Sequence, residues 1–345
     1  MKTKAAILVE QKKPLEISEI DIPKLGIGQV LVKISATRIC GSQLGEIDGV
    51  KGRDRWLPHL LGHEAGGTVL ETGPGVKTVQ TDDRVVMHWR PSEGMEAPDC
   101  PVYDWEGKKV NAGPITTFSH LAVLSENRLT RVPDDTDYEL CCLLADTLTT
   151  GFGIVNRDAA VEIGESVVLI GAGGIGSGAI LGAHLAGANP IVAVDLYDHK
   201  LAVAKSLGAT HLINARSEGV EDQVRKIVGE RGADVTIEGT GLPQVIEQCY
   251  RLTSPTGRCI LFGVMHHSES VAIHTLPLHL GKVLTGSEGG QSLPHRDIPR
   301  YLRLIANRNL DLSKMVSHRG TLDDVNDLIE KMRNGEVQHA IMKFP

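Results

Sequence analysis

The sequence lacks several features that mark particular classes of protein. Aromatic residues make up only 3% of its 345 residues, and no run of Lys and Arg is long enough to bind nucleic acid. The N-terminal segment becomes charged too early for a signal peptide. Six cysteines, at positions 40, 100, 141, 142, 249 and 259, show no paired framework, so we expect reduced thiols. We therefore expect a cytoplasmic protein without nucleic-acid partners.

Charge is also missing from one long stretch, residues 166–194, which could span a bilayer by length alone. This stretch contains seven glycines and an Asn189–Pro190 break, and the apolar run Val167–Ile170 leads straight into the glycines. A strand, a helix and a second strand explain the pattern better, because buried parallel strands also read as unbroken apolar runs. We expect no membrane partner.

The rest of the composition is that of an ordinary globular protein, and a chain of 345 residues favours two domains. In the first part of the chain, before the pattern changes at about residue 150, the sequence predicts short strands between Gly- and Pro-rich turns, which is typical of a compact β-rich unit such as a partly open barrel. These predicted strands are 4–10, 15–20, 30–35, 67–71, 84–88 and 118–124.

After about residue 150 strands and helices alternate, which predicts a parallel sheet covered by helices. The predicted strands are 167–170, 191–194, 211–214, 233–238, 258–262 and 283–285. The predicted helices between them are 174–187, 199–207, 220–228 and 244–252. Two further helices, 297–306 and 322–332, and a strand, 340–344, are predicted at the C-terminal end.

The segment Gly171-Ala-Gly-Gly-Ile-Gly176 fits a dinucleotide-binding turn between a strand and a helix. Gly171 permits the tight turn, Gly173 lets a phosphate approach the backbone, and Gly176 lets the helix pack on the sheet. Asp195 ends the next predicted strand, where a carboxylate binds the ribose of NAD and repels the 2′-phosphate of NADP. The alternative is that Asp195 only caps the following helix.

Three residues offer zinc-binding side chains. Cys40 lies 22 residues before the segment Gly62-His63-Glu64, and thiolate and imidazole are ligands that zinc prefers. Asp146 is a candidate third ligand, and the alternative for His63 is an ordinary core histidine. A metal that polarises an oxygen, together with a carrier that moves hydride, indicates interconversion of an alcohol and a carbonyl compound.

The chain resembles the zinc-dependent alcohol dehydrogenases of the medium-chain dehydrogenase/reductase superfamily, in collinear order over nearly its whole length. The resemblance implies a GroES-like catalytic domain, 1–150 and 291–345, with a Rossmann domain, 151–290, inserted between its two parts. The matching segments are Ile39-Cys-Gly-Ser-Gln43, Gly62-His-Glu-Ala-Gly66, Leu144-Ala-Asp-Thr-Leu-Thr-Thr-Gly151, Gly171–Gly176, Val194-Asp195 and Lys200.

The resemblance also implies roles for single residues. Cys40, His63 and Asp146 would hold one catalytic zinc, with Asp146 where the family commonly has Cys. Glu64 would lie beside the metal or coordinate it in one state, and Ser42 would relay a proton. The residues implied for NAD binding are Thr150, Gly171, Gly173, Gly174, Ile175, Gly176, Asp195, Lys200, Gly263, Val264 and Ser287.

The chain departs from the family pattern at several positions. Only Cys100 lies in the segment 89–117, where a structural zinc needs four cysteines, so we expect no structural zinc. Gln43 replaces an acidic residue that often follows the relay hydroxyl, and Gly45 replaces the histidine that often ends the relay. His339 lies where an arginine often neighbours the pyrophosphate.

The substrate is less well defined. His88, Trp89 and Arg90 fall where the family lines its substrate pocket, so Trp89 would narrow the pocket while His88 and Arg90 would add hydrogen-bond donors. Lys51, Arg53 and Arg55 lie on the loop before His63. These residues favour a polyol, a sugar alcohol or a phosphorylated derivative, or they are solvated surface charges. Two other functions stay open: a metal-free NAD(P)H-dependent quinone or enoyl reductase, and a non-catalytic nucleotide-binding protein. By resemblance we expect a homodimer or homotetramer.

Overall fold

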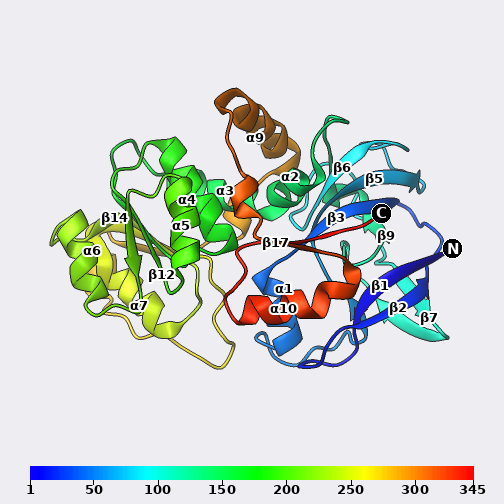
Figure 1. The fold of residues 1–345 in the computed structure, drawn as a ribbon, viewed down its shortest axis with the longest axis horizontal. Coiled ribbons are helices and arrows are strands. Elements are labelled where there is room, and N and C mark those ends of the chain that lie inside the picture. The colour runs from blue at the N-terminus through cyan, green and yellow to red at the C-terminus, as the bar shows by residue number, and fades with distance from the viewer. The chain divides into compact units, whose positions relative to one another are not determined.

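The computed structural model describes residues 1–345, and the chain folds into two compact units. The first unit comprises Met1–Asp146 and Leu293–Pro345, and the second comprises Thr147–Ser292. Both ends of the chain therefore belong to the first unit, as Figure 1 shows. The second unit is an insertion in the first.

Five short strands of the first unit form a closed barrel. Its order is β1 (Lys2–Leu8), β2 (Glu16–Asp21), β7 (Val102–Trp105), β8 (Lys108–Asn111) and β4 (His59–Leu60). The two-residue strand β4 pairs with both β1 and β8 and so completes the ring. The barrel is closed, where the sequence pattern had suggested a partly open one.

The other strands of the first unit form a seven-stranded sheet. Its order is β10 (Leu129–Arg131), β6 (Arg84–His88), β5 (Glu64–Thr72), β3 (Gln29–Ile39), β18 (Ala340–Lys343) and β17 (His318–Gly320), and β9 (Leu121–Ser125) also pairs with β3. Strand β18 pairs with β3 through Ala340 opposite Ile39, so the end of the chain completes the sheet.

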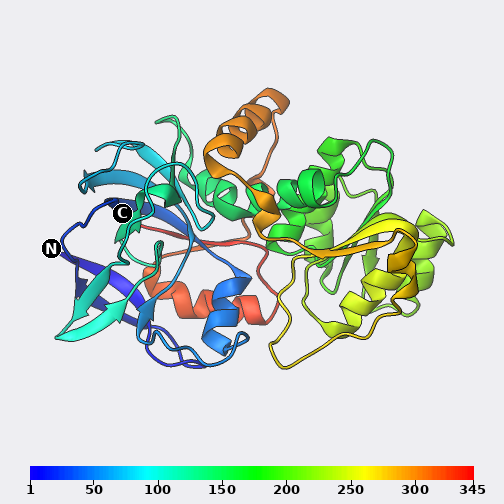
Figure 2. The ribbon, with the colours of Figure 1, turned by 180° about the vertical axis from the view of Figure 1, so that it is seen from behind.

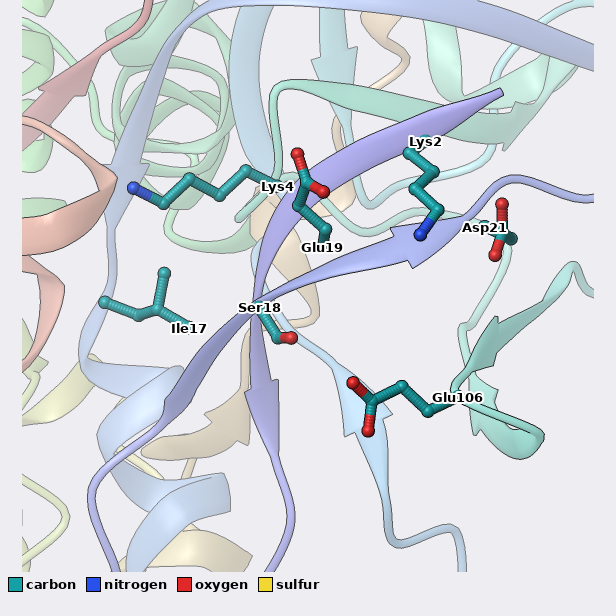
Figure 3. Close-up of a pocket in the computed structure, with 7 residues that line it drawn as sticks. All are labelled: Lys2, Lys4, Ile17, Ser18, Glu19, Asp21 and Glu106. Atoms are coloured by element: carbon teal, nitrogen blue, oxygen red, sulfur yellow. The ribbon is translucent and has the colours of Figure 1, made fainter.

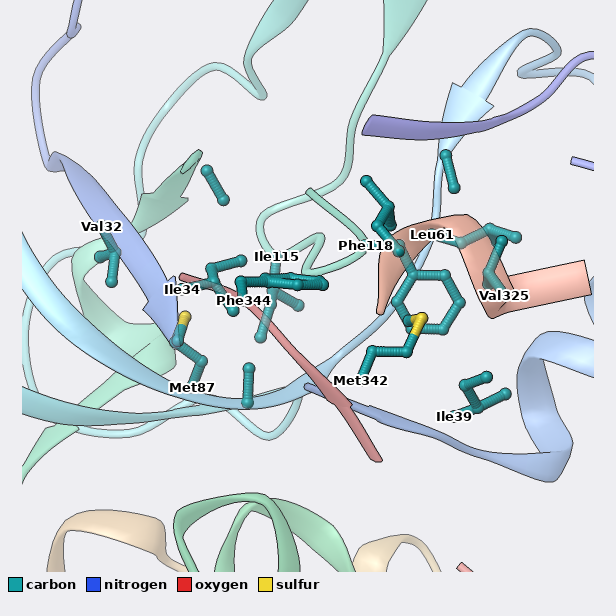
Figure 4. Close-up of a cluster of buried hydrophobic side chains, with 14 of the residues drawn as sticks. Val32, Ile34, Ile39, Leu61, Met87, Ile115, Phe118, Val325, Met342 and Phe344 are labelled. Carbon is teal, nitrogen blue, oxygen red and sulfur yellow. The ribbon is translucent and has the colours of Figure 1, made fainter. Parts of the chain in front are cut away.

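The apolar core of this unit lies against that sheet. Side chains from β3, β6 and β18 gather with Phe118 and Phe344, as Figure 4 shows. The unit's longer helices are α1 (Gly41–Asp48), α2 (Tyr138–Cys142), α9 (Pro294–Arg308) and α10 (Val325–Arg333), and its 3-10 turns are Glu126–Arg128, Ser313–Met315 and Leu322–Asp324. Helix α10 contacts α1, and Figure 2 shows the two side by side in red and blue.

The second unit has a six-stranded parallel sheet, which confirms the predicted Rossmann fold. Its order is β13 (His211–Asn214), β12 (Ile191–Asp195), β11 (Val167–Ile170), β14 (Ala233–Glu238), β15 (Thr253–Leu261) and β16 (Val283–Gly286). Helix α4 contacts α5, and α6 contacts α7. The helices are α3 (Leu148–Gly153), α4 (Gly174–Ala186), α5 (Asp198–Ser206), α6 (Val220–Val228), α7 (Pro243–Leu252) and α8 (Leu276–His279), with a π-helical turn Ile154–Asp158 and a 3-10 turn Gly289–Gln291. A further π-helical turn, Leu143–Thr147, precedes α3 and belongs to the first unit up to Asp146.

The charge-free stretch 166–194 forms β11, α4 and β12, as predicted. A different segment, Tyr138–Asp158, is long and apolar enough to cross a membrane. However, 83% of its most apolar window is buried inside the protein. Such burial is typical of a core helix in a globular protein.

Candidate metal centre and nucleotide-binding turn

The pairing of β3 with β5 brings Cys40 and His63 together. Thr37 near the end of β3 lies opposite Ala65 at the start of β5, so the residues just beyond these strand ends are neighbours. Gly62 turns the chain there with a φ of 93°, and a Cβ on it would lie 2.4 Å from the Thr117 hydroxyl. The local fold therefore requires glycine before His63.

A helical segment brings Asp146 to the same place. Helix α2 packs closely on β5, because a Cβ on Gly66 would lie 2.6 Å from the Cβ of Cys141. The chain then widens into the π-helical turn Leu143–Thr147, which contains Asp146. Such turns inside helices are frequent at functional sites, because the extra residue changes the direction of the side chains that follow.

Four side chains converge at this point. Cys40, His63, Glu64 and Asp146 each offer one ligand atom, and these atoms all lie within 4.8 Å of one another. His63 Nε2 lies 3.5 Å from Glu64 Oε1 and 4.0 Å from Asp146 Oδ2. Glu64 Oε1 is buried and accepts no hydrogen bond. A buried acceptor of this kind is costly unless a cation compensates it, so the donor set fits zinc.

The electrostatics of this cluster also favour positive charge. Burial tends to lower the pKa of His63, but its contacts with Cys40 and Glu64 outweigh burial and raise that pKa well above its usual value. Burial likewise tends to raise the pKa of Glu64, but the ion pair with Arg38 and the contact with His63 lower it. The centre therefore stabilises a cation and keeps the Glu64 carboxylate ionised.

Two polar side chains contact His63. The Ser42 hydroxyl lies 3.5 Å from its Nε2 atom. Gln43 Oε1 accepts a hydrogen bond from the Cys40 backbone N–H at 2.8 Å, and Gln43 Nε2 lies 2.6 Å from His63 Nδ1. Gln43 thus links the cap of α1 to His63, and its place three residues after a helix cap is a sequence signal for such a contact.

The segment 88–90, at the end of β6, differs from its predicted role. His88 is buried, its two nitrogens contact the Arg90 carbonyl and the Thr130 hydroxyl, and burial lowers its pKa to about 4. The suggestion that His88 offers a donor to a substrate is therefore wrong. Trp89 instead donates its indole N–H to Asp146 Oδ1 at 3.0 Å. Neither this contact nor the Arg38–Glu64 pair has a sequence motif that could have predicted it.

The glycine-rich turn has the geometry of a phosphate-binding loop. Gly171 has a φ of 99°, and Gly173 is the N-cap of α4, with open space where a Cβ would be. A Cβ on Gly176 would lie 2.1 Å from the Gly171 carbonyl oxygen, so only glycine allows this packing. Gly174 and Ile175 form the first turn of α4, whose N-terminal amides can bind a pyrophosphate.

Asp195 ends β12 and holds the turn. Its carboxylate accepts hydrogen bonds from the Ala172 N–H at 2.8 Å and the Tyr197 N–H at 3.0 Å. The N-cap of α5 is Tyr197, so the alternative that Asp195 caps this helix is wrong. Lys200 lies on α5 with its ammonium 4.8 Å from the centre of the Tyr197 ring.

The remaining residues predicted for NAD binding also belong to the second unit. Thr150 is buried in α3, and Val264 is exposed. Gly263 packs closely on the backbone, since its Cβ would lie 2.3 Å from the Gly241 nitrogen. The Ser287 hydroxyl donates to the Asp158 carboxylate.

A surface depression over β1 and β2 contains none of the predicted site residues. Its lining carries charges of both signs, and Lys4 pairs with Asp323 outside it. Figure 3 shows the residues that line it: Lys2, Lys4, Ile17, Ser18, Glu19, Asp21 and Glu106.

Comparisons with known proteins agree with this geometry. Residues 26–134 match the alcohol dehydrogenase GroES-like domain, and residues 174–307 match the zinc-binding dehydrogenase domain. The S-(hydroxymethyl)glutathione dehydrogenase of Paracoccus denitrificans is 30% identical, and the class-3 alcohol dehydrogenase of Cereibacter sphaeroides is 31% identical, each over 100% of both chains. The chain belongs to the zinc-dependent alcohol dehydrogenase family.

Solved structures of similar proteins support the same family assignment. A zinc-binding-domain alcohol dehydrogenase protein from Burkholderia ambifaria superposes with a TM-score of 0.91 at 28% identity, covering 100% of this chain and 99% of its own. Benzyl alcohol dehydrogenase from Acinetobacter calcoaceticus gives 0.89 at 26% identity over 100% of both chains. The chain is therefore an oxidoreductase of a family that uses zinc and NAD to interconvert alcohols and carbonyl compounds.

Proposed function

We propose that this protein oxidises a primary or secondary alcohol, or reduces the corresponding carbonyl compound, with NAD(H) as hydride carrier. The observation that carries the proposal is the convergence of Cys40, His63, Glu64 and Asp146 within 4.8 Å. Sulfur, imidazole nitrogen and carboxylate oxygen are all ligands that zinc accepts. A metal-free quinone or enoyl reductase would bury these acidic groups at a cost and without a use for them.

In this proposal Cys40, His63 and Asp146 hold a single zinc ion, and Glu64 coordinates it in one state. Bound zinc supplies a Lewis acid that polarises the substrate oxygen. In oxidation the Ser42 hydroxyl accepts the proton of the substrate hydroxyl while its own proton passes on towards solvent, and in reduction the transfer runs in reverse. Its position 3.5 Å from His63 Nε2 supports this role.

We propose no structural zinc. The segment 89–117 contains one cysteine, the exposed Cys100. A carboxylate fixes the neighbouring loops instead. Glu126 accepts hydrogen bonds from the backbone N–H groups of Lys77, Thr78 and Met95 at 2.6–2.7 Å. These bonds hold two loops to one carboxylate without a metal.

NAD is the proposed carrier, with Asp195 accepting hydrogen bonds from the ribose hydroxyls and disfavouring NADP. The proposed domains are a catalytic domain, 1–150 and 291–345, and a nucleotide-binding domain, 151–290. The division of the chain into compact units near these boundaries supports the assignment. The other proposed NAD contacts are Thr150, Gly171, Gly173, Gly174, Ile175, Gly176, Lys200, Gly263, Val264 and Ser287.

For the substrate, we propose a polar alcohol such as a polyol, a sugar alcohol or a phosphorylated derivative. Arg90 supports this class, because it brings a positive charge close to the candidate metal centre. Its guanidinium lies 5.5 Å from the ring of Trp89, whose indole N–H donates to Asp146. We propose a cytoplasmic homo-oligomer. Strand β16 supports assembly, because it ends the sheet of the second unit with Val283 exposed.

Elemental analysis combined with a substrate panel tests the proposal. We expect about one zinc per chain, a preference for NAD over NADP, and loss of both zinc and turnover in Cys40→Ser. The matched control is Cys100→Ser, which changes an exposed cysteine and should keep both. Turnover of quinones or enoyl compounds without zinc would instead indicate the reductase. Nucleotide binding without any turnover would indicate the non-catalytic protein.

A further inference from the structure

We propose that Trp89 is a positioning residue for the metal centre, and that it is matched to a carboxylate rather than a thiolate at position 146. The inference rests on the proposed function, because it assumes that Asp146 is a zinc ligand. It concerns a residue that would act through Asp146 and not on the substrate.

The contact between Trp89 and Asp146 makes the two oxygens of the Asp146 carboxylate different. Trp89 Nε1 donates to Asp146 Oδ1 at 3.0 Å, while Oδ2 lies 4.0 Å from His63 Nε2. An indole N–H is only a donor, so the oxygen it holds is the less available one for a metal. The oxygen nearer His63, Oδ2, is then the one that would bind the metal, so Asp146 would be a ligand through a single oxygen.

The indole is itself held in place from several sides. Trp89 follows His88, which is buried, hydrogen-bonded through both nitrogens and paired with Glu64 across β5 and β6. The Trp89 ring packs against the apolar core, and the guanidinium of Arg90 lies 5.5 Å from its centre. A donor fixed in this way can orient its acceptor with little loss of entropy.

Chemistry makes the pair specific. A partly buried indole N–H needs an acceptor, and a carboxylate oxygen is a strong one, whereas sulfur is a weak one. A thiolate also has only one sulfur atom, whereas a carboxylate has two oxygens. It could therefore not accept the indole N–H and bind the metal through separate atoms. Trp89 and Asp146 should therefore contribute to zinc affinity together, and Trp89 should matter little when position 146 is cysteine.

A double-mutant cycle on zinc affinity tests this, with affinity measured by chelator competition on the full chain. Removal of a group that orients a ligand typically costs 10–100-fold in metal affinity. We expect Trp89→Phe, which keeps an aromatic ring, to weaken zinc binding by about 10–100-fold in the natural background. The same change should have an effect below about threefold when combined with Asp146→Cys.

The matched control is Trp105→Phe. Trp105 also donates its indole N–H, to Ser18 at 3.0 Å, but in the barrel. This variant should bind zinc like the natural protein. The visible spectrum of the cobalt-substituted protein gives a second readout, which Trp89→Phe should shift and Trp105→Phe should leave unchanged. Circular dichroism and the urea midpoint check that each variant is folded.

The outcomes separate the two proposals. If the natural protein binds no zinc, both fail. If it binds zinc and Trp89→Phe leaves affinity and the cobalt spectrum unchanged, only the role of Trp89 is overturned. An equal loss of affinity with aspartate and with cysteine at position 146 also overturns it, because Trp89 would then act through general packing.

Discussion

Arg38→Met should be among the most damaging single changes in the first unit. The Arg38 and Glu64 side chains are 3% and 0% exposed and form a buried ion pair. Methionine keeps much of the length of arginine but leaves the Glu64 carboxylate without its cation. Removal of one partner from a buried pair costs about 3–5 kcal/mol, because the remaining charge is uncompensated.

Urea unfolding followed by tryptophan fluorescence measures this loss. The protein has three tryptophans, Trp56, Trp89 and Trp105, and all lie in the first unit, so their emission reports on that unit. We expect the free energy of unfolding of the metal-free protein to fall by about 3–5 kcal/mol. Zinc should reduce the loss, because a second cation then lies beside Glu64.

Two further variants sharpen the test. Arg38→Met combined with Glu64→Leu removes both charges and should be more stable than Arg38→Met alone. Arg131→Met is the surface control, because Arg131 pairs with Asp83 while its own side chain is 58% exposed, so its loss should be small. The reasoning is refuted if Arg38→Met costs less than about 1 kcal/mol, or if the double variant is the less stable one.

Three other predictions follow from single contacts. Gly176→Ala should abolish NADH binding in a fluorescence titration, because its Cβ would lie 2.1 Å from the Gly171 carbonyl oxygen; an unchanged affinity would contradict this. Gln43→Glu should tighten zinc binding in chelator competition, because a carboxylate can accept from both the Cys40 N–H and a His63 Nδ1–H; weaker binding would argue against it. Hydrogen bonds from Arg319 and Lys343 lower the pKa of Glu139 to about 2, so its contribution to stability is full above about pH 4.5 and falls as the pH drops towards 2. Glu139→Gln should therefore lower the urea midpoint at pH 6 and lose this deficit progressively below pH 4.5, whereas a deficit independent of pH would exclude the ion pair as its cause.

Much of the second unit could be predicted from the sequence. The bounds of β11, β13, β14 and α6 match the predicted ranges at both ends. In this unit the hydrophobic pattern is strong, because buried parallel strands form short apolar runs that glycines and polar residues interrupt. The glycine-rich turn was also predictable, because the glycines of its sequence motif are the residues that its backbone conformation and packing require.

The first unit was less predictable. Strand β3 runs to Ile39, beyond the predicted end at Ser35, because Thr37 and Arg38 are polar yet buried. The Thr37 hydroxyl donates to the Glu64 carbonyl, and Arg38 pairs with the Glu64 side chain. Helix α1 and the two-residue strand β4 were not predicted, because short elements carry too few residues for a periodic pattern.

Charge explains why so many partners gather at the candidate metal centre. A metal-bound Cys40 is a thiolate, and Glu64 and Asp146 are carboxylates, which together give three negative charges. Arg38 supplies one positive charge, so two negative charges of the cluster remain uncompensated. A divalent cation balances this deficit, whereas a univalent one does not. The same arithmetic requires that loss of Arg38 and loss of zinc reinforce each other, because both leave Glu64 buried with fewer cations beside it.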